Sequence, residues 1–439
     1  MPNSTTIATA LRRSAAQRIF LHEPQALETP EFNRLHTRHS FEERALHLAR
    51  QGDIVLLGGA IETSYLDYLA ELGIGPRRCD ILVIDTDTDT GLTQRLATHN
   101  DWIEALRPVV DANRDLRVSP YYRTPQTEQI AQALSTAFGR PVGWDAGPPD
   151  VTRTANNKAR MRSLAEDLEI PIAPGETVAC TAGPSDVLGE LRKAACRHLS
   201  LTGRVIVKAA TANLEYDNII VDEQALGLLP AWLRQRPHVT EYVVESLLPT
   251  KHSPNCTAWI HDAKSWETLG ASQQRLDNNL QHTGNIFPFV LPPEVSKYAT
   301  LILRRLAALG LRGPVGLDFI EGENVSGCPQ HFFVEVNPRV NGSTYASAIW
   351  EGVNAQRRVH GLNTLASCSS IRSVDTTFST FSQLRARAGE LIYTHDRGCG
   401  VVPYNTAALA HHNISTVALA EDAATARALE QAFLRQING

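Results

Sequence analysis

Short apolar runs alternate with amphipathic segments along the first third of the chain. The run 53–58 is apolar and ends at a Gly-Gly pair, which is typical of a buried parallel strand followed by a turn. An amphipathic segment follows at 63–72, a second strand is expected at 79–84, and a helical pattern occupies 127–138. Strands and helices that alternate at this spacing predict a wound α/β unit.

The pattern changes in the middle of the chain. Gly147-Pro148-Pro149 is expected to be a linker, and a single helix is expected at 154–169. The runs 205–208 and 219–221 flank a polar loop and predict a hairpin. Further strands are predicted at 242–246, 256–261, 268–271, 315–320, 331–336 and near Val401, and helices at 296–309 and 422–437. This change to antiparallel strands near residue 200 predicts separate domains.

Composition excludes several classes of protein. The formal net charge of −5 does not suggest nucleic acid as a partner, although it does not exclude a local basic patch. No apolar run approaches the roughly 18–20 residues that span a bilayer. The N-terminal segment carries Arg12, Arg13 and Arg18 before its first acid, and we prefer a surface arm or short helix to an organellar transit peptide. Seven dispersed cysteines without a C-x-x-C pair argue against a disulfide framework or zinc site and favour a reducing cytoplasm.

The most informative polar residues lie on two predicted strands near residue 330. Alternate side chains of a strand share a face, so Glu335 and Asn337 project together while Val334 and Val336 face the core. If the preceding strand pairs antiparallel with this one, Asp318 joins the same face. Two carboxylates and one carboxamide oxygen that converge in this way suit Mg²⁺ together with nucleotide phosphates.

Basic residues extend this pattern. Pro338 ends the strand, and Arg339 places a guanidinium where it can stabilise charge on a transferred phosphoryl group. Lys208 closes a buried strand and Lys158 opens a helix, and each either reaches a phosphate or lies on the surface. Any single acid would be an ordinary charge on a solvated strand face, but the combined spacing favours a metal–phosphate site.

The order and spacing of these residues resemble the ATP-grasp superfamily. The resemblance covers about 155–350 and rests on Asn157-Lys158, Val207-Lys208, Val244–Leu247, Asp318 and Glu335–Arg339. It implies an α/β fold of the α+β ATP-grasp type. The implied parts are a wound α/β pre-ATP-grasp domain at 1–150, a two-lobed ATP-grasp core with antiparallel sheets at 151–375 (lid lobe about 170–245), and a small C-terminal module at 376–439.

The resemblance also implies which residues bind which ligand. ATP lies between two antiparallel sheets in this family. The implied phosphate ligands are Lys158 and Lys208, and the implied adenine contacts are Glu245, Ser246 and Leu247. The implied metal ligands, for two Mg²⁺ ions that Mn²⁺ can replace, are Asp318, Glu335 and Asn337. Arg339 faces the acyl phosphate, and the turn that follows holds the acceptor substrate through Asn341, Ser343 and Thr344.

The implied activity is that of a ligase. The carboxylate of one small molecule is activated as an acyl phosphate with release of ADP, and an amine then displaces phosphate. Arg275 either clamps a carboxylate or phosphate or is a surface arginine, and His282 is a candidate base or a neutral loop residue. A small-molecule kinase and a non-catalytic ATP-binding module are the alternatives.

The whole chain is similar to a narrower branch, the peptide ligases of the pheganomycin type. The segments Asp53–Leu69 and Gly400–Asn405 fit its layout of a wound domain before the grasp and a small module after it. This implies amino acids or peptides as substrates, a role in specialised metabolism such as antibiotic biosynthesis, and a cytoplasmic enzyme. Relatives are commonly dimers, so a homodimer is among the expected assemblies.

One segment departs from the family pattern. Many relatives have a glycine-rich loop after the second lysine, whose backbone amides close over phosphates. Here the loop 209–218 contains no glycine. Thr211 and Asn213 side chains could replace the amides, or the loop could close only with substrate present.

Overall fold

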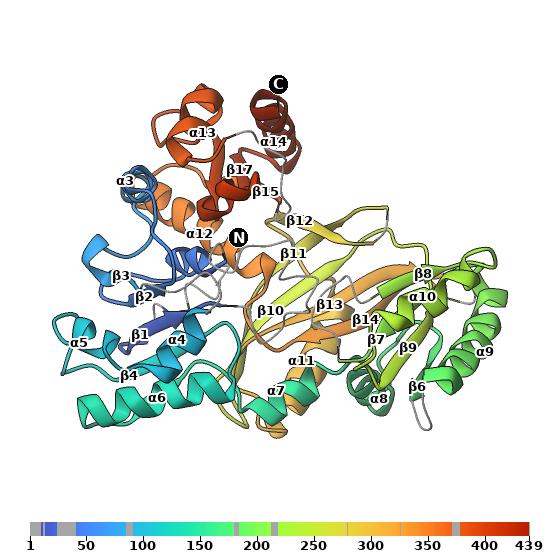
Figure 1. The fold of residues 1–439 in the computed structure, drawn as a ribbon. Coiled ribbons are helices and arrows are strands. Elements are labelled where there is room, and N and C mark those ends of the chain that lie inside the picture. Colours follow the sequence, from blue (N-terminus) through green and yellow to red (C-terminus); the bar gives the residue numbers. More distant parts are fainter. Residues whose placement is uncertain are drawn as a thin grey trace.

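The computed structural model describes residues 10–11, 14–23, 41–84, 91–179, 184–211, 218–278, 280–324, 326–370 and 378–438. Its strands form three sheets, which Figure 1 shows as an N-terminal lobe in blue and cyan, a green lobe at the right, and a long sheet between them that continues into the red C-terminal part. The predicted combination of a wound domain with antiparallel sheets is confirmed.

The N-terminal domain is a five-stranded parallel sheet in the order β3-β2-β1-β4-β5. Its strands are β1 (Gln17–Leu21), β2 (Ile54–Leu57), β3 (Ile81–Val83), β4 (Leu116–Pro120) and β5 (Val142–Trp144). Its helices are α3 (Thr63–Glu71), α4 (Leu92–Thr98), α5 (Trp102–Leu106) and α6 (Pro125–Phe138). β1 and β2 are buried along their whole length, which explains the continuous apolar run of β2.

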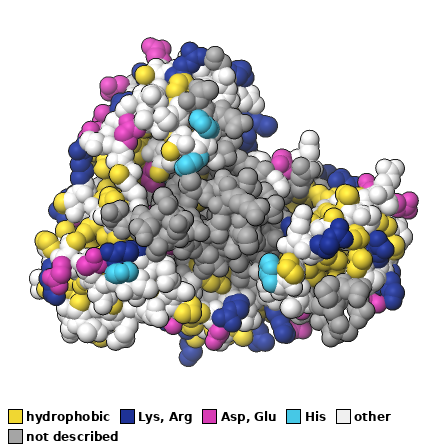
Figure 2. Space-filling view, viewed as in Figure 1, with side chains coloured by type: hydrophobic (Ala, Val, Ile, Leu, Met, Phe, Trp, Pro, Cys, Tyr) yellow, Lys and Arg dark blue, Asp and Glu magenta, His cyan; other side chains and the backbone are white. Residues whose placement is uncertain are grey.

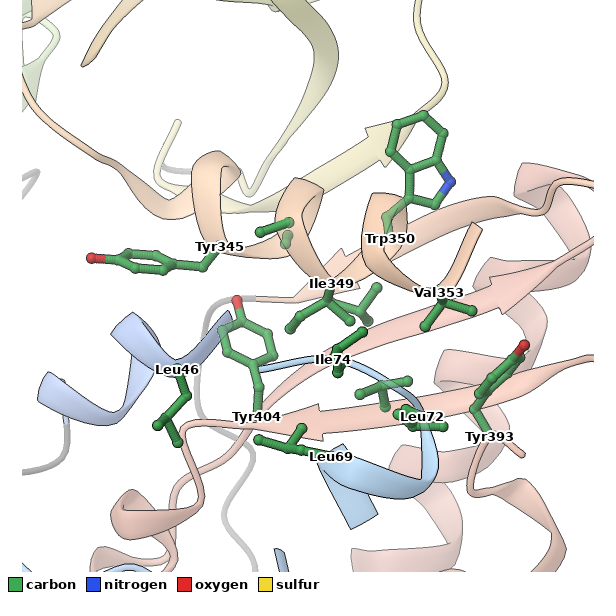
Figure 3. Close-up of a cluster of buried hydrophobic side chains, with 14 of the residues drawn as sticks. Leu46, Leu69, Leu72, Ile74, Tyr345, Ile349, Trp350, Val353, Tyr393 and Tyr404 are labelled. Atoms are coloured by element: carbon green, nitrogen blue, oxygen red, sulfur yellow. The ribbon is translucent and has the colours of Figure 1, made fainter. Parts of the chain in front are cut away.

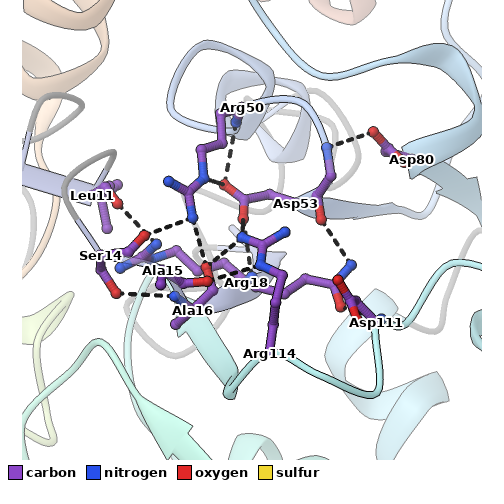
Figure 4. Close-up of polar contacts among 12 residues, drawn as sticks. Leu11, Ser14, Ala15, Ala16, Arg18, Arg50, Asp53, Asp80, Asp111 and Arg114 are labelled. Carbon is purple, nitrogen blue, oxygen red and sulfur yellow. Dashed lines mark hydrogen bonds and ion pairs between the residues drawn. The ribbon is translucent and has the colours of Figure 1, made fainter.

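A buried polar network fixes the start of this domain (Figure 4). The Asp53 carboxylate accepts the backbone N–H of Arg18 at 3.1 Å, and the Arg18 guanidinium donates to Asp145 at 2.6 Å. Arg50 and Arg114 donate to backbone carbonyls of the segment 14–16. These contacts compensate charges that burial would otherwise make costly, so we assign the network a structural role.

The single helix expected at 154–169 is wrong. The structure has α7 (Pro149–Ala155) and α8 (Lys158–Asp167), separated at Asn156-Asn157. The Asn157 side chain caps α8 by accepting the backbone N–H of Arg160 at 2.8 Å. The expected linker is also shorter than predicted, because Pro149 occupies the first turn of α7, where its missing N–H costs nothing.

The green lobe in Figure 1 is a four-stranded antiparallel sheet, hereafter the lid sheet, in the order β6-β9-β7-β8. Its elements are β6 (Gly175–Ala179), α9 (Pro184–Thr202), β7 (Val205–Ala209), β8 (Asn218–Val221), α10 (Leu229–Arg234) and β9 (Glu241–Ser246). β7 and β8 form the predicted hairpin. α9 covers one face of the sheet, with its own hydrophobic core.

The third sheet, hereafter the floor sheet, has eight antiparallel strands in the order β14-β13-β10-β11-β12-β15-β17-β16. The strands are β10 (Pro254–Ile260), β11 (Trp266–Leu276), β12 (His282–Phe287), β13 (Gly313–Glu323), β14 (Pro329–Asn337), β15 (Ala366–Ser370), β16 (Gly400–Tyr404) and β17 (Ser415–Ala420). The helices are α11 (Pro293–Ala308), α12 (Gly342–Val359), α13 (Phe381–Ala388) and α14 (Ala423–Asn438). The expected boundary at 375/376 thus falls between strands of one sheet.

One large hydrophobic core joins the first and last parts of the chain. Leu46 and Leu69 come from the N-terminal domain, Ile349 from α12, and Tyr404 from β16, and Figure 3 shows these side chains in one cluster. Tyr68 donates its hydroxyl to the Tyr393 carbonyl at 3.0 Å within the same core. The C-terminal module therefore shares its core with the N-terminal domain and its sheet with the middle of the chain.

On the face shown in Figure 2, acidic and basic side chains are interspersed, and hydrophobic side chains gather on the lobe at the right. No helix in the part of the chain that the structure describes has the length and apolarity needed to cross a membrane.

Candidate functional site

Three predicted oxygen ligands meet where β13 pairs with β14. Asp318 lies directly opposite Glu335, and Gly316 opposite Asn337. Asn337 Nδ2 lies 2.8 Å from Asp318 Oδ2 and 3.3 Å from Glu335 Oε1. The convergence expected from antiparallel pairing is present, and the role of these side chains as metal ligands stays a prediction.

A β-bulge at this point changes one expectation. The pairing passes from Asp318–Glu335 to Phe319–Phe333, so Val334 is an extra residue on β14. Val334 is only half-buried, whereas Phe333 and Val336 belong to the core under the floor sheet. The prediction that Val334 faces the core is therefore wrong, because the bulge reverses the alternation before Glu335.

Cations surround the Glu335 carboxylate. Lys158 Nζ, from the first turn of α8, lies 3.3 Å from Glu335 Oε2. Burial alone would raise the pKa of Glu335, but the charges of Lys158, Lys208 and Arg339 together hold it below the ordinary value. Three side chains far apart in the sequence thus place positive charge at one carboxylate, which is the electrostatic setting that phosphate groups require.

Lys208 reaches the site from the end of β7 in the lid sheet. Its ammonium lies 2.6 Å from Glu245 Oε2 on β9, and Arg162 of α8 donates to Glu245 Oε1 at 3.0 Å. All three side chains are buried, so Lys208 is not the surface lysine of the alternative interpretation. The sequence analysis missed Arg162. Its position on the buried side of α8, where a charged side chain needs a partner, could have indicated its role.

The segment Glu245–Leu247, the implied adenine contact, does not begin on an open strand edge. β9 is an inner strand that pairs with β6 on one side and β7 on the other. The backbone N–H groups of Ser246 and Leu247 donate to the carbonyls of Pro174 and Arg204. The structure therefore shows this segment positioning Lys208, and its contact with adenine stays a prediction.

Arg339 lies at the junction of the floor sheet with α7. Its guanidinium donates to Asn156 Oδ1 at 2.7 Å, a partner that the sequence did not reveal. Burial raises the pKa of Tyr122, next to β4 of the N-terminal domain, and the positive charge of Arg339 opposes that rise. Arg339 is therefore near both Glu335 and the N-terminal domain, and its contact with an acyl phosphate stays a prediction.

The turn after Arg339 is held by its own side chains. Asn341 caps α12, since its Oδ1 accepts the backbone N–H of Thr344 at 3.2 Å and the Thr344 hydroxyl at 3.0 Å. The Ser343 hydroxyl oxygen lies 2.7 Å from Asn341 Oδ1 and 3.1 Å from Asn255 Oδ1, so its single proton lies between the two amide oxygens. These contacts give all three residues a structural role, and their contact with an acceptor substrate stays a prediction.

Arg275 lies away from the three oxygen ligands. Its neighbour Gln274 donates to Asp318 Oδ1 at 3.0 Å, so Arg275 leaves β11 on the opposite face. There its guanidinium donates to Glu430 of α14 at 2.7 Å and to the Ser369 carbonyl at 2.9 Å. Arg275 is half-buried on a strand and not in a loop, and the contacts that the structure shows for it join the C-terminal helix to the floor sheet. Its catalytic role stays a prediction.

The donor set fits a nucleotide-bound divalent cation. Oxygen ligands from Asp318 and Glu335 suit Mg²⁺, whose remaining positions are usually filled by water and phosphate. Among the described residues there is no cluster of three or more His, Cys, Asp and Glu, so the site depends on the carboxamide of Asn337 as its third group. Residues 212–217 of the glycine-free loop, Asn213 included, lie outside the described residues, so the structure does not test its predicted phosphate contacts.

Comparisons with protein families find two domains in the chain. Residues 42–136 match the model of a Pre ATP-grasp domain, and residues 234–343 match the model of an ATP-grasp domain. The second match includes Glu245, Asp318 and the segment 335–339. No curated protein matches the chain.

Several solved structures share the fold. An N5-carboxyaminoimidazole ribonucleotide synthetase in its ADP complex has 12% identity and a TM-score of 0.55, over 96% of each chain. The N5-carboxyaminoimidazole synthase of Aspergillus clavatus, solved with ADP and 5-aminoimidazole ribonucleotide, has 12% identity and a TM-score of 0.54, over 97% of this chain and 99% of that one. Phosphoribosylamine–glycine ligase of Thermotoga maritima has 11% identity and a TM-score of 0.51, over 96% of each. At these identities the similarity shows the fold alone.

Proposed function

We propose, from the premise that this chain belongs to the ATP-grasp superfamily, that it is an ATP-dependent carboxylate–amine ligase that releases ADP and phosphate. The observation that carries the proposal is the meeting of Asp318, Glu335 and Asn337 beside Lys158. Oxygen ligands and cations at one point suit the transfer of a phosphoryl group from ATP to a substrate carboxylate.

Each group has a role in this proposal. A divalent cation, when bound, would supply positive charge that neutralises the phosphates. Asp318, Glu335 and Asn337 would hold that cation, and Lys158 and Lys208 would bind phosphate oxygens. Arg339 would stabilise the charge that develops as the substrate carboxylate attacks the γ-phosphate, and would then face the acyl phosphate until the amine displaces phosphate.

The proposed substrates are small molecules, with amino acids or peptides as both acid and amine. Their use in specialised metabolism, such as antibiotic biosynthesis, rests on the resemblance to the pheganomycin-type peptide ligases. The solved structures with this fold include one whose bound molecules are ADP and an aminoimidazole ribonucleotide, so a small molecule bound together with ADP has a precedent in the fold. A cytoplasmic homodimer is the assembly that the resemblance supports.

A screen of ADP release tests the proposal. The purified protein is incubated with ATP, Mg²⁺ and pairs of amino acids, and products are identified by mass. Ligase activity predicts ADP, phosphate and a condensed product that requires both acid and amine. AMP and pyrophosphate would contradict acyl-phosphate chemistry.

The same screen separates the two alternatives. A kinase would form ADP and a phosphorylated acid with no dependence on amine. A non-catalytic module would bind ATP with no turnover across the whole panel. The glycine-free loop 209–218 is the best support for the second alternative, because it offers fewer flexible backbone amides to phosphate.

A further inference from the structure

Two side-chain amides that no part of the sequence pattern singled out as ligands hold the Asp318 carboxylate. Asn255 lies on β10 directly opposite Asp318, and its Nδ2 donates to Asp318 Oδ1 at 2.6 Å. Gln274, on β11 beyond it, donates its Nε2 to the same Oδ1 at 3.0 Å. Two neighbouring strands thus supply one hydrogen bond each to a single carboxylate oxygen.

Each amide is also held at its other end. Asn255 Oδ1 accepts the hydroxyls of Ser343 at 3.1 Å and Thr257 at 3.2 Å. Gln274 Oε1 accepts the hydroxyl of Ser253 at 2.7 Å. A carboxylate only accepts hydrogen bonds, so an amide turned by half a rotation would place oxygen against oxygen. The contacts therefore fix the orientation of both amides.

Burial makes this arrangement stiff. Asn255 is 1% exposed and Asp318 is 8% exposed, so water does not compete freely for these hydrogen bonds. Hydrogen bonds to an ionised acceptor are shorter and stronger than neutral ones. Because Asp318 Oδ1 is held from one side, the plane of the carboxylate is fixed. Asp318 Oδ2 then lies 2.8 Å from Asn337 Nδ2.

We propose that Asn255 and Gln274 are positioning residues that hold Asp318 by Oδ1 and present Oδ2 to a nucleotide-bound divalent cation. The inference rests on the proposed function, since it assigns a cation to Asp318. It explains why amide side chains occupy β10 and β11 beside fully buried Cys256. Through the Ser343 hydroxyl, it also couples Asp318 to the first turn of α12.

The test measures binding of Mn²⁺ and ADP to the full chain. Asn255→Leu and Gln274→Met remove the hydrogen bonds at nearly constant volume. Mn²⁺ affinity at saturating ADP is measured by the signal of free Mn²⁺ in electron paramagnetic resonance, and ADP affinity is measured by calorimetry with Mn²⁺ and with a chelator. We expect Mn²⁺ affinity to fall about 10–100-fold, as for other groups that orient metal ligands. ADP affinity in chelator should be unchanged.

Asn285→Leu is the matched control. Asn285 is a buried amide of the same sheet, on β12, that donates to the Ser272 hydroxyl at 2.8 Å and lies in a separate hydrogen-bond group. Its replacement should lower thermal stability as much as Asn255→Leu does but leave Mn²⁺ affinity unchanged. This separates positioning of the cation ligand from a general loss of packing.

The outcomes are distinct. Unchanged Mn²⁺ affinity in both Asn255→Leu and Gln274→Met, or an equal loss in Asn285→Leu, would overturn the inference while the proposed function stands. A parallel loss of ADP affinity in chelator would also overturn it, since a positioning role acts through the cation. Wild-type protein whose ADP binding does not depend on Mn²⁺ would overturn the proposed function and the inference together.

Discussion

At the scale of single residues, a substitution of Glu335 tests the proposed phosphoryl transfer most directly. Glu335→Gln keeps the shape and removes one of two negative charges from the oxygen-ligand group. We expect the turnover number to fall about 100-fold or more, since a lost cation ligand costs several kcal/mol of charge stabilisation. ADP release with a productive acid–amine pair measures it.

The control for this variant is Glu321→Gln, on β13 at the other end of the same strand pair. It makes the same chemical change outside the group and should leave turnover intact. Glu335→Gln that retained full activity would remove Glu335 from the proposed site.

The raised pKa of Glu43 predicts that the stability of the fold depends on pH. Burial raises its pKa to about 7, although hydrogen bonds from Ala407 and Thr406 oppose the rise. The unfolded chain has the ordinary value of 4.5, so between these two pH values the folded state binds more protons. The contribution of Glu43 to the free energy of unfolding is therefore full below pH 4.5 and is lost as pH rises through 7.

Glu43→Gln does not titrate, so it should gain stability relative to wild type between pH 5 and 8, by on the order of 3 kcal/mol. Urea unfolding at the two pH values measures the difference. Glu390→Gln, at an exposed glutamate of the C-terminal module, should show no such gain. A difference between wild type and Glu43→Gln that did not change with pH would contradict the prediction.

At the scale of elements, an ion pair between Arg275 and Glu430 joins β11 of the floor sheet to α14. Glu430 is 1% exposed, and the Arg275 side chain is 23% exposed. Arg275→Met leaves a buried carboxylate uncompensated and should cost about 3–5 kcal/mol of stability. Glu430→Met leaves an arginine that can reach water and should cost less.

The double variant Arg275→Met/Glu430→Met should recover part of the loss, because no buried charge remains. Chemical unfolding of the three variants measures this. If Arg275 instead acts in catalysis, Arg275→Met would abolish turnover while the free energy of unfolding stayed the same. That result would restore the role that the sequence first suggested.

The sequence predicted elements better than it predicted their interruptions. The strands near residues 318 and 335 were found because apolar residues flank isolated polar ones, and the structure pairs them as expected. The break between α7 and α8 was missed because Asn156 and Asn157 lie inside a continuous helical pattern, and only the cap contact of Asn157 shows the new start.

Residues that act through others were also hidden. Asn255 and Gln274 contact Asp318 from strands 63 and 44 positions away in the sequence, and no local pattern encodes such a contact. The bulge at Val334 was missed for a related reason, since a single extra residue changes the alternation only once the partner strand is known.

At the scale of the whole molecule, the C-terminal module completes a sheet and a core that begin in earlier parts of the chain. Its strands complete the floor sheet, and its side chains, among them Phe381 and Phe433, complete the core that contains Tyr68 of α3. A chain ending after Ser370 should be insoluble or unfolded, because it exposes that core and leaves β15 as an unpaired edge.

Size-exclusion chromatography and far-ultraviolet circular dichroism test the truncation. Co-expression of the missing segment should restore soluble protein, because the fragment can complete the core from outside the chain. A truncated monomer that unfolds cooperatively would show that the module is an independent domain.

The separation of the lid sheet from the floor sheet has a mechanical consequence. Lys208 is carried by the first and Asp318 by the second, and the chain passes between the two sheets near residues 168–175 and 246–254. A rotation about these two crossings would separate the Lys208 ammonium from the Asp318 carboxylate while the pairings within each of the two sheets stay intact. Stiffening either crossing should therefore slow the release of product more than it slows the bond-making step.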